Sequence, residues 1–132
     1  IKPERPASGF EFESRYGFRR GPRQQLVFEP PVIRLSEVAQ YVGHVVYFQG
    51  KVVEVQKSRA TSTYCVKFQR GPWPRVFKLV VFPNYVDNFT LGGQTIRDYE
   101  HKMIRVRGLI QDHPEWGLEI IIYNENAIRV ID

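Results

Sequence analysis

Two stretches decide the fold: His44–Gln56, HVVYFQGKVVEVQ, and Lys102–Gln111, KMIRVRGLIQ. Apolar residues take every second position over much of each run, which is the period of a β-strand with one buried face. The residues expected to face inward are Val46, Phe48, Gly50, Val52 and Val55 in the first stretch and Ile104, Val106, Gly108 and Ile110 in the second. A glycine inside a strand predicts a bulge or a sharp bend at Gly50, which a small barrel needs in order to curl.

The rest of the chain from Pro31 onward alternates strand-sized runs with turn residues. Further strands are expected over Tyr64–Gln69, Arg75–Phe82, Leu118–Tyr123 and, as a short closing strand, Ala127–Ile131. A polar connection, residues 84–101, separates the third strand from the fourth. A short helix is expected over residues 37–42, with Ser36 as its N-cap and Gly43 as its stop.

Five main strands and the long connection before the fourth predict an all-β fold. This order suits a five-stranded Greek-key barrel of the OB type, with a short N-terminal helix in front of it. The competing architecture is an SH3-like barrel, which does not normally carry so long an insertion at that place. We therefore expect one OB-fold domain over residues 33–132.

Residues 1–32 have a different texture and are predicted to form an extended N-terminal arm. They carry five prolines and three glycines among charged and aromatic residues, without helical periodicity. The arm has no core of its own, so it is expected to lie against the barrel, a second copy or a partner protein. Its anchors are expected to be Phe10, Phe12, Tyr16 and Phe18, interleaved with Arg15, Arg19, Arg20 and Arg23.

Several strings resemble one known family. LSEVAQYVG (Leu35–Gly43) precedes a strand that contains Gly50-Lys51-Val52. The later matching positions are Val66-Lys67-Phe68, Pro74, Phe77, Leu79, Val81, Phe82, Tyr99, Lys102, Ile104, Val106, Gly108, Ile110, Ile120, Ile122, Ile128 and Val130. Over residues 33–132 this set resembles the bacterial OB-fold nucleic-acid-binding domains, which occur alone or appended to nucleases. The resemblance implies binding of single-stranded DNA or RNA. One departure is His101, where the family usually has glycine.

The chain is basic, with a net charge of +5, and its charge is unevenly distributed. No acidic residue lies between Glu54 and Asp87, whereas six cations do: Lys57, Arg59, Lys67, Arg70, Arg75 and Lys78. In the expected fold this segment forms the usual ligand face of an OB-fold. Alternation directs Lys67 and Lys78 away from the core, and we expect both to reach solvent and contact phosphates. The alternative is a solvated strand face that resists edge pairing.

Aromatic side chains are the second requirement for binding single strands, because bases stack on them. Tyr47 is expected to face outward, and Trp73 and Trp116 lie in predicted loops, although Trp73 between two prolines also suits a cap on the barrel end. Lys51, Arg105 and Arg107 extend the predicted basic surface. For the two arginines, pairing with Glu119 on a neighbouring strand is an equal alternative.

The sequence offers no catalytic constellation. Its one cysteine, Cys65, lies in a strand-like run, and its three histidines are dispersed without metal-ligand spacing. We therefore predict a non-enzymatic module without cofactor or metal that binds single strands largely irrespective of sequence. The alternative is an OB-fold assembly module whose arm docks on a partner protein or a second copy. No apolar run is long enough to cross a bilayer, so no membrane partner is expected and a cytoplasmic location is favoured.

Overall fold

A computed structural model describes residues 29–131 of the chain, and this part is mostly β, in two sheets with short helical segments. The strands are β1 (Val32–Ile33), β2 (Val45–Lys51), β3 (Glu54–Lys57), β4 (Tyr64–Lys67), β5 (Lys78–Val81), β6 (Met103–Leu109), β7 (Gln111–His113), β8 (Gly117–Ile121) and β9 (Ile128–Val130). The helical segments are η1 (Leu35–Tyr41), η2 (Trp73–Arg75), η3 (Pro83–Asn88), η4 (Glu125–Ala127) and α1 (Gly93–Arg97). In these residues no helix has the length and apolar character that a membrane crossing requires.

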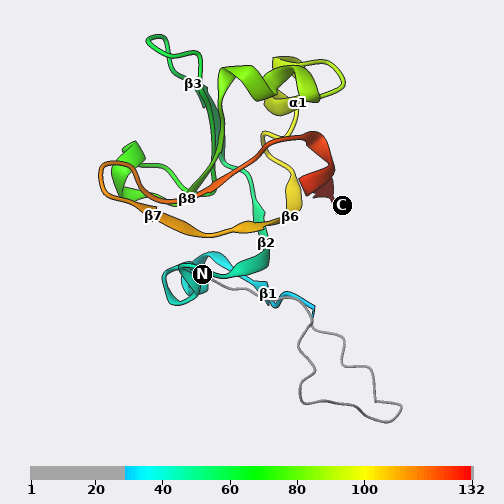
Figure 1. Cartoon of the computed structure of the whole chain (residues 1–132). Helices are drawn as coiled ribbons and strands as arrows, with labels where there is room; N and C mark the ends of the chain where they lie inside the picture. Colours follow the sequence, from blue (N-terminus) through cyan, green and yellow to red (C-terminus); the bar gives the residue numbers. More distant parts are fainter. Residues whose placement is uncertain (1–28, 132) are drawn as a thin grey trace, which may run out of the picture.

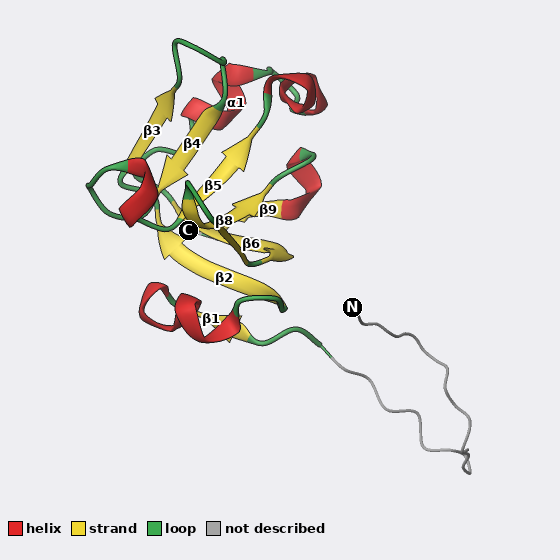
Figure 2. Ribbon diagram, turned by 60° about the vertical axis from the view of Figure 1, so that its left-hand side comes forward, coloured by secondary structure: helices red, strands yellow, loops and turns green. Residues whose placement is uncertain are grey.

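The four-stranded sheet has the order β1-β2-β6-β9, and the five-stranded sheet has the order β3-β4-β5-β8-β7. Neighbouring strands are antiparallel except for two parallel pairs, β1 with β2 and β5 with β8. Figure 2 shows β3, β4 and β5 side by side on one side of β2, and β1 on the other. The described part is therefore mostly β, as the expected all-β class requires of its strands, while closure of the sheets into a five-stranded Greek-key barrel stays a prediction.

The core lies between the two sheets and contains the inward residues that alternation predicts, apart from the glycines Gly50 and Gly108. Its centre is a cluster of three rings, with Phe48 4.6 Å from Phe68 and 4.8 Å from Phe77 between ring centroids. Gly50 makes room for this cluster, because a Cβ there would come within 2.9 Å of the Phe48 ring. Of the two features expected at Gly50, the bulge is wrong, because the residue pairs in regular register with Ile104. The sharp bend is displaced to Val52 and Val53.

The long first strand bends two residues later, where its backbone changes partners. The N–H of Val52 donates to the carbonyl of Lys102, and Val52 in turn accepts from the N–H of His101, both at 2.9 Å. The next N–H, that of Val53, donates instead to the carbonyl of Lys67 at 2.9 Å. The single strand expected over residues 44–56 is therefore two strands, β2 in one sheet and β3 in the other (Figure 1).

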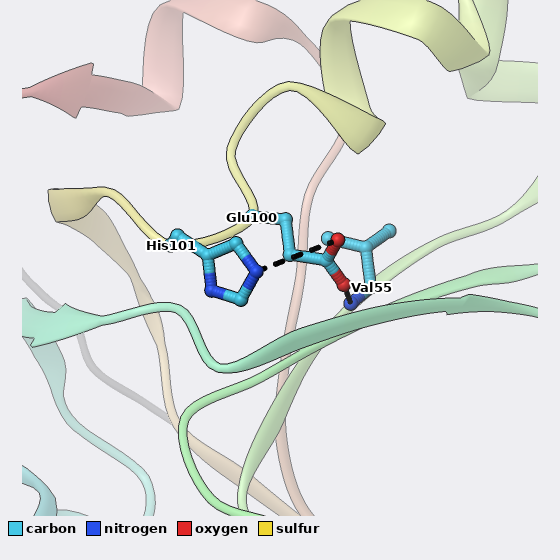
Figure 3. A network of polar contacts seen from close by, with 3 residues as sticks. All are labelled: Val55, Glu100 and His101. Carbon is cyan, nitrogen blue, oxygen red and sulfur yellow. Dashed lines mark hydrogen bonds and ion pairs between the residues drawn. The ribbon is translucent and has the colours of Figure 1, made fainter.

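The turn that precedes β6 holds this bend from outside. The Glu100 carboxylate accepts a hydrogen bond from the backbone N–H of Val55 at 3.1 Å, as Figure 3 shows. The neighbouring His101 has a φ of 72°, in the left-handed region that disfavours residues with a Cβ. Its Nε2 lies 4.0 Å from a Glu100 carboxylate oxygen. The glycine that the resembling family has here suits this backbone conformation.

The expected short helix is present as η1, with different ends. Its N-cap is Arg34 rather than Ser36, and the N–H of Arg34 donates to the Glu37 carboxylate at 2.8 Å. The predicted stop is confirmed, because Gly43 follows the C-cap with a φ of 87°. Figure 1 places η1 beside β1, at the opposite end of the molecule from α1.

The chain enters the described part at the outer edge of β2. The carbonyl of Pro31 accepts from the N–H of Tyr47 at 2.8 Å, and β1 continues this contact as a two-residue parallel strand. Residue 32, which we assigned to the arm, is thus part of the four-stranded sheet. The other features of the arm, its aromatic anchors and arginines, lie outside the described residues.

We predict that His101→Gly raises the free energy of unfolding by about 0.5–1 kcal/mol, because it removes the cost of a left-handed residue while adding some chain entropy to the unfolded state. Urea unfolding measures the change. His101→Ala is the control, since it removes the ring and keeps the strained backbone. Equal stabilisation by the two substitutions would show that the ring, and not the backbone, is responsible.

Candidate nucleic-acid interface

Lys67 and Lys78 do face away from the core, but they do not reach solvent. The two residues are opposite each other on β4 and β5, and Lys78 is also opposite Glu119 on β8. Their exposed fractions are 3% for Lys67 and 0% for Lys78, and Glu119 is 5% exposed. The expectation that these lysines form a solvent-exposed ligand face is therefore wrong.

The β4–β5 connection, residues 68–77, and the β7–β8 turn supply the hydrogen-bond partners of the two lysines. The Lys67 ammonium donates to the carbonyl of Gly71 at 2.8 Å. The Lys78 ammonium donates to the carbonyl of Trp73 at 2.8 Å and to that of Trp116. Burial lowers the pKa of Lys78 and raises that of Glu119. Both lysines thus serve as internal donors that hold loops in place.

The acid-free segment of the sequence is not acid-free in space. Glu54 is opposite Lys67 in the sheet, and Glu119, which comes much later in the chain, is opposite Lys78. The outward row across β3, β4, β5 and β8 therefore reads Glu54, Lys67, Lys78, Glu119, with two charges of each sign. The cations of this segment that remain exposed lie at its edge and in loops: Lys57, Arg59, Arg70 and Arg75.

Two loops bring the tryptophans together. Trp73, in η2, donates from its indole N–H to the side-chain oxygen of Gln56 on β3 at 3.0 Å. Trp116 lies in the β7–β8 turn, where the Nδ1 of His113 accepts from its backbone N–H at 3.2 Å. The two indoles meet edge to face, with ring centroids 6.0 Å apart. Trp116 remains 45% exposed, and Trp73 is half-buried.

Cations dominate the outward side of the four-stranded sheet. The Arg105 guanidinium donates from Nε and Nη2 to the side-chain oxygen of Gln49, at 3.1 and 2.8 Å. In register, Arg105 stands opposite Arg129, and Arg107 stands opposite Tyr47. We call this surface the basic face, with the members Tyr47, Lys51, Arg105, Arg107 and Arg129.

The outward-facing positions of β2, β6 and β9 include no acidic residue: they are Val45, Tyr47, Gln49, Lys51, Met103, Arg105, Arg107, Leu109 and Arg129. The alternative in which Arg105 and Arg107 pair with Glu119 is wrong, because Glu119 is buried in the other sheet. Within residues 29–131, the one basic side chain that lies within 4.0 Å of a carboxylate of the same range is His101, beside Glu100.

Sequence reasoning missed Arg129 and Gln49. Arg129 lies between two apolar residues of the short closing strand, Ile128 and Val130, so alternation indicates that it faces outward. Alternation does not indicate which strand lies beside it.

Cys65 is a buried strand thiol, and burial raises its pKa to about 11. In the described part of the chain, His, Cys, Asp and Glu side chains form no group of three or more that could hold a metal ion.

Comparison with known proteins gives a weak structural likeness. No family model matches the chain, and no curated protein matches its sequence. The structure is similar to an aspartyl-tRNA synthetase from Entamoeba histolytica, with 8% identity and a TM-score of 0.48 over 83% of this chain and 26% of that chain. It is also similar to the asparaginyl-tRNA synthetase of the same organism, with 15% identity and a TM-score of 0.47 over 76% and 23%. The chain thus spans about a quarter of the length of these proteins.

We predict that Lys67→Met lowers the free energy of unfolding by about 1–3 kcal/mol, because it leaves the Gly71 carbonyl without its donor. Chemical denaturation measures the loss. The matched control is Lys51→Met, an exposed lysine on β2, which should stay within about 0.5 kcal/mol of the parent protein. Equal stability of the two variants would mean that the Lys67 ammonium does not hold the connection.

Proposed function

We propose that this chain is a non-catalytic OB-type module that binds single-stranded nucleic acid largely irrespective of sequence. The observation that carries the proposal is the basic face, with its four cations and no acid on the outward positions of β2, β6 and β9. We propose this face as the binding surface instead of the outward side of β4 and β5, because the lysines there are buried and stand beside carboxylates.

A polyanion accounts for the charge arrangement on this surface. Like charges directly opposite each other on neighbouring strands are destabilising, and Arg105 and Arg129 stand in that relation. Gln49 orients the Arg105 guanidinium without neutralising it. Phosphates supply the missing negative charge, and their neutralisation releases counterions that favour binding.

The aromatic member of the basic face favours single strands. Tyr47 is partly exposed beside the exposed Arg107, so its ring would offer a stacking surface next to a cation that suits phosphate. Any of the bases can stack on such a ring, but the base must be unpaired, as it is in a single strand. The outward amide oxygen of Gln49 is occupied by Arg105, and the remaining polar members of the basic face are cations that suit phosphates, so little sequence preference is expected.

The pairing of the strands supports the OB assignment. The strand that begins as β2 and continues as β3 contributes to both sheets, and β6 and β7 are separated by Ile110 alone. The parallel pair of β5 and β8 joins two strands that are far apart in sequence. Such an arrangement is what a five-stranded Greek-key barrel with a bent first strand requires.

We predict that replacing Arg105, Arg107 and Arg129 with Gln weakens binding to oligo(dT) and oligo(U) alike. Three lost phosphate contacts, at about 0.7 each, reduce the slope of log K against log salt concentration by about 2. Fluorescence anisotropy at several salt concentrations measures both effects. The free energy of unfolding of the triple variant should equal or exceed that of the parent protein, because the opposed like charges of Arg105 and Arg129 are gone.

The control for this variant is Arg97→Gln, which removes a charge from α1, on the other sheet. It should lower the salt slope by much less than the triple variant. An unchanged salt slope in the triple variant would show that the basic face does not bind phosphates. Tighter binding to duplex than to single strands would contradict the proposed single-strand preference.

One observation favours the second candidate, an assembly module. The end of the same sheet face next to β1 is apolar, with Val32, Val45 and Leu109 all exposed and Val45 opposite Leu109. This end lies where the arm joins the sheet, so it suits a contact with a second copy or a partner protein.

If assembly is the function, Leu109→Glu should reduce the mass measured by light scattering to that of a monomer, because it places a charge in the contact. Leu91→Glu, at an exposed leucine outside both sheets, is the matched control and should leave the mass unchanged. A parent protein that is already monomeric, with intact oligonucleotide binding, would exclude self-assembly.

A further inference from the structure

Trp73 and Trp116 are the only tryptophans of the chain, and they belong to connections that are far apart in sequence. Trp73 lies between β4 and β5, and Trp116 lies between β7 and β8. Their edge-to-face contact therefore depends on what joins the two connections, and the joining groups are on the five-stranded sheet, away from the basic face.

One buried ammonium joins them. Lys78 donates to the backbone carbonyls of both Trp73 and Trp116, and its side chain is fully buried beneath them. The connections also touch directly, since a Cβ at Gly117 would come within 2.5 Å of the Pro74 carbonyl oxygen. The indole of Trp73 is fixed further by its hydrogen bond to Gln56. The buried Lys78 ammonium and the Gln56 side chain thus fix the position of the two rings relative to each other.

We infer that Lys78 is a positioning residue that holds the two indoles as one aromatic unit, and that the exposed ring of Trp116 is a stacking platform for an unpaired nucleobase. The inference rests on the proposed function and adds a second contact point to it. A ring braced by Trp73 loses little conformational freedom when a base stacks on it, which favours binding.

The surrounding charges favour a nucleobase on the ring itself. Arg70 and Arg75, both exposed, flank Trp73 in the same connection and suit the phosphates of a strand that crosses it. Glu115, also exposed, precedes Trp116 and repels phosphate at the ring. The planar base of the strand, and not its backbone, is therefore the group that meets Trp116.

Tryptophan fluorescence, excited at wavelengths that the seven tyrosines do not absorb, reports on this unit alone, because the chain has no other tryptophan. Oligo(dT) added to the full chain should quench the emission. An abasic oligonucleotide of the same length and charge should still bind, by anisotropy competition, and leave the emission unchanged. Equal quenching by both would overturn the platform, because it would show that phosphate binding alone perturbs the indoles.

Substitution of Trp116 separates this inference from the proposed function. Trp116→Leu should weaken oligo(dT) binding roughly ten-fold without changing the salt slope, which is the opposite of the arginine variant. The matched control is Tyr123→Leu, an exposed aromatic residue that follows β8. Undiminished affinity in Trp116→Leu, with the arginine variant still weakened, would overturn the platform and keep the proposed function.

The role of Lys78 has a readout in the free protein. Two indoles fixed edge to face give an exciton couplet in far-ultraviolet circular dichroism, and Lys78→Met should abolish it. Gln56→Met is the milder variant, which frees the Trp73 indole without removing a buried charge, and it should weaken the couplet. A couplet that survives in both folded variants would overturn the positioning role. Oligonucleotide binding too weak to measure would overturn the platform and the proposed function together.

Discussion

The exchange of hydrogen-bond partners between Val52 and Val53 is the constraint on which the rest of the structure depends. Up to Val52 the strand pairs with the β6 side, and from Val53 it pairs with β4. One continuous segment therefore supplies both candidate surfaces. Its first half carries Tyr47 and Lys51 of the basic face, and its second half carries Gln56, which fixes the Trp73 indole.

Buried lysines give the five-stranded sheet a role different from that of a charged binding surface. An ammonium group is costly to bury unless its hydrogen-bonding capacity is satisfied. The acceptors are backbone carbonyls of loops rather than of strands: that of Gly71 for Lys67, and those of Trp73 and Trp116 for Lys78. The lysines of β4 and β5 thereby hold the β4–β5 connection and the β7–β8 turn in place by hydrogen bonds.

The parts of the fold that depend on local alternation could be predicted from the sequence. The inward faces of β2 and β6, the stop at Gly43 and the outward direction of Lys67 and Lys78 all follow from period and turn chemistry. Whether an outward side chain meets solvent depends on where a neighbouring connection folds, and alternation carries no such information.

The same limit applies to the candidate site. Tyr47, Arg105 and Arg107 were found because each lies on a strand with clear alternation. The Arg105–Arg129 opposition, the position of Glu119 beside Lys78 and the meeting of the two tryptophans each join segments far apart in the chain. They require strand order and register, which local alternation and turn residues do not reveal.

The two residues of β1 have a consequence for how the protein behaves in a concentrated solution. They occupy the outer edge of β2, together with the contact between Pro31 and Tyr47. Without them, β2 presents a row of unpaired N–H and C=O groups, which is a template for pairing with any extended chain. Proteolytic trimming that stops before Pro31 leaves this edge sealed. Trimming that removes Val32 and Ile33 frees the backbone groups of Tyr47 and Phe48 at this edge for pairing with another chain.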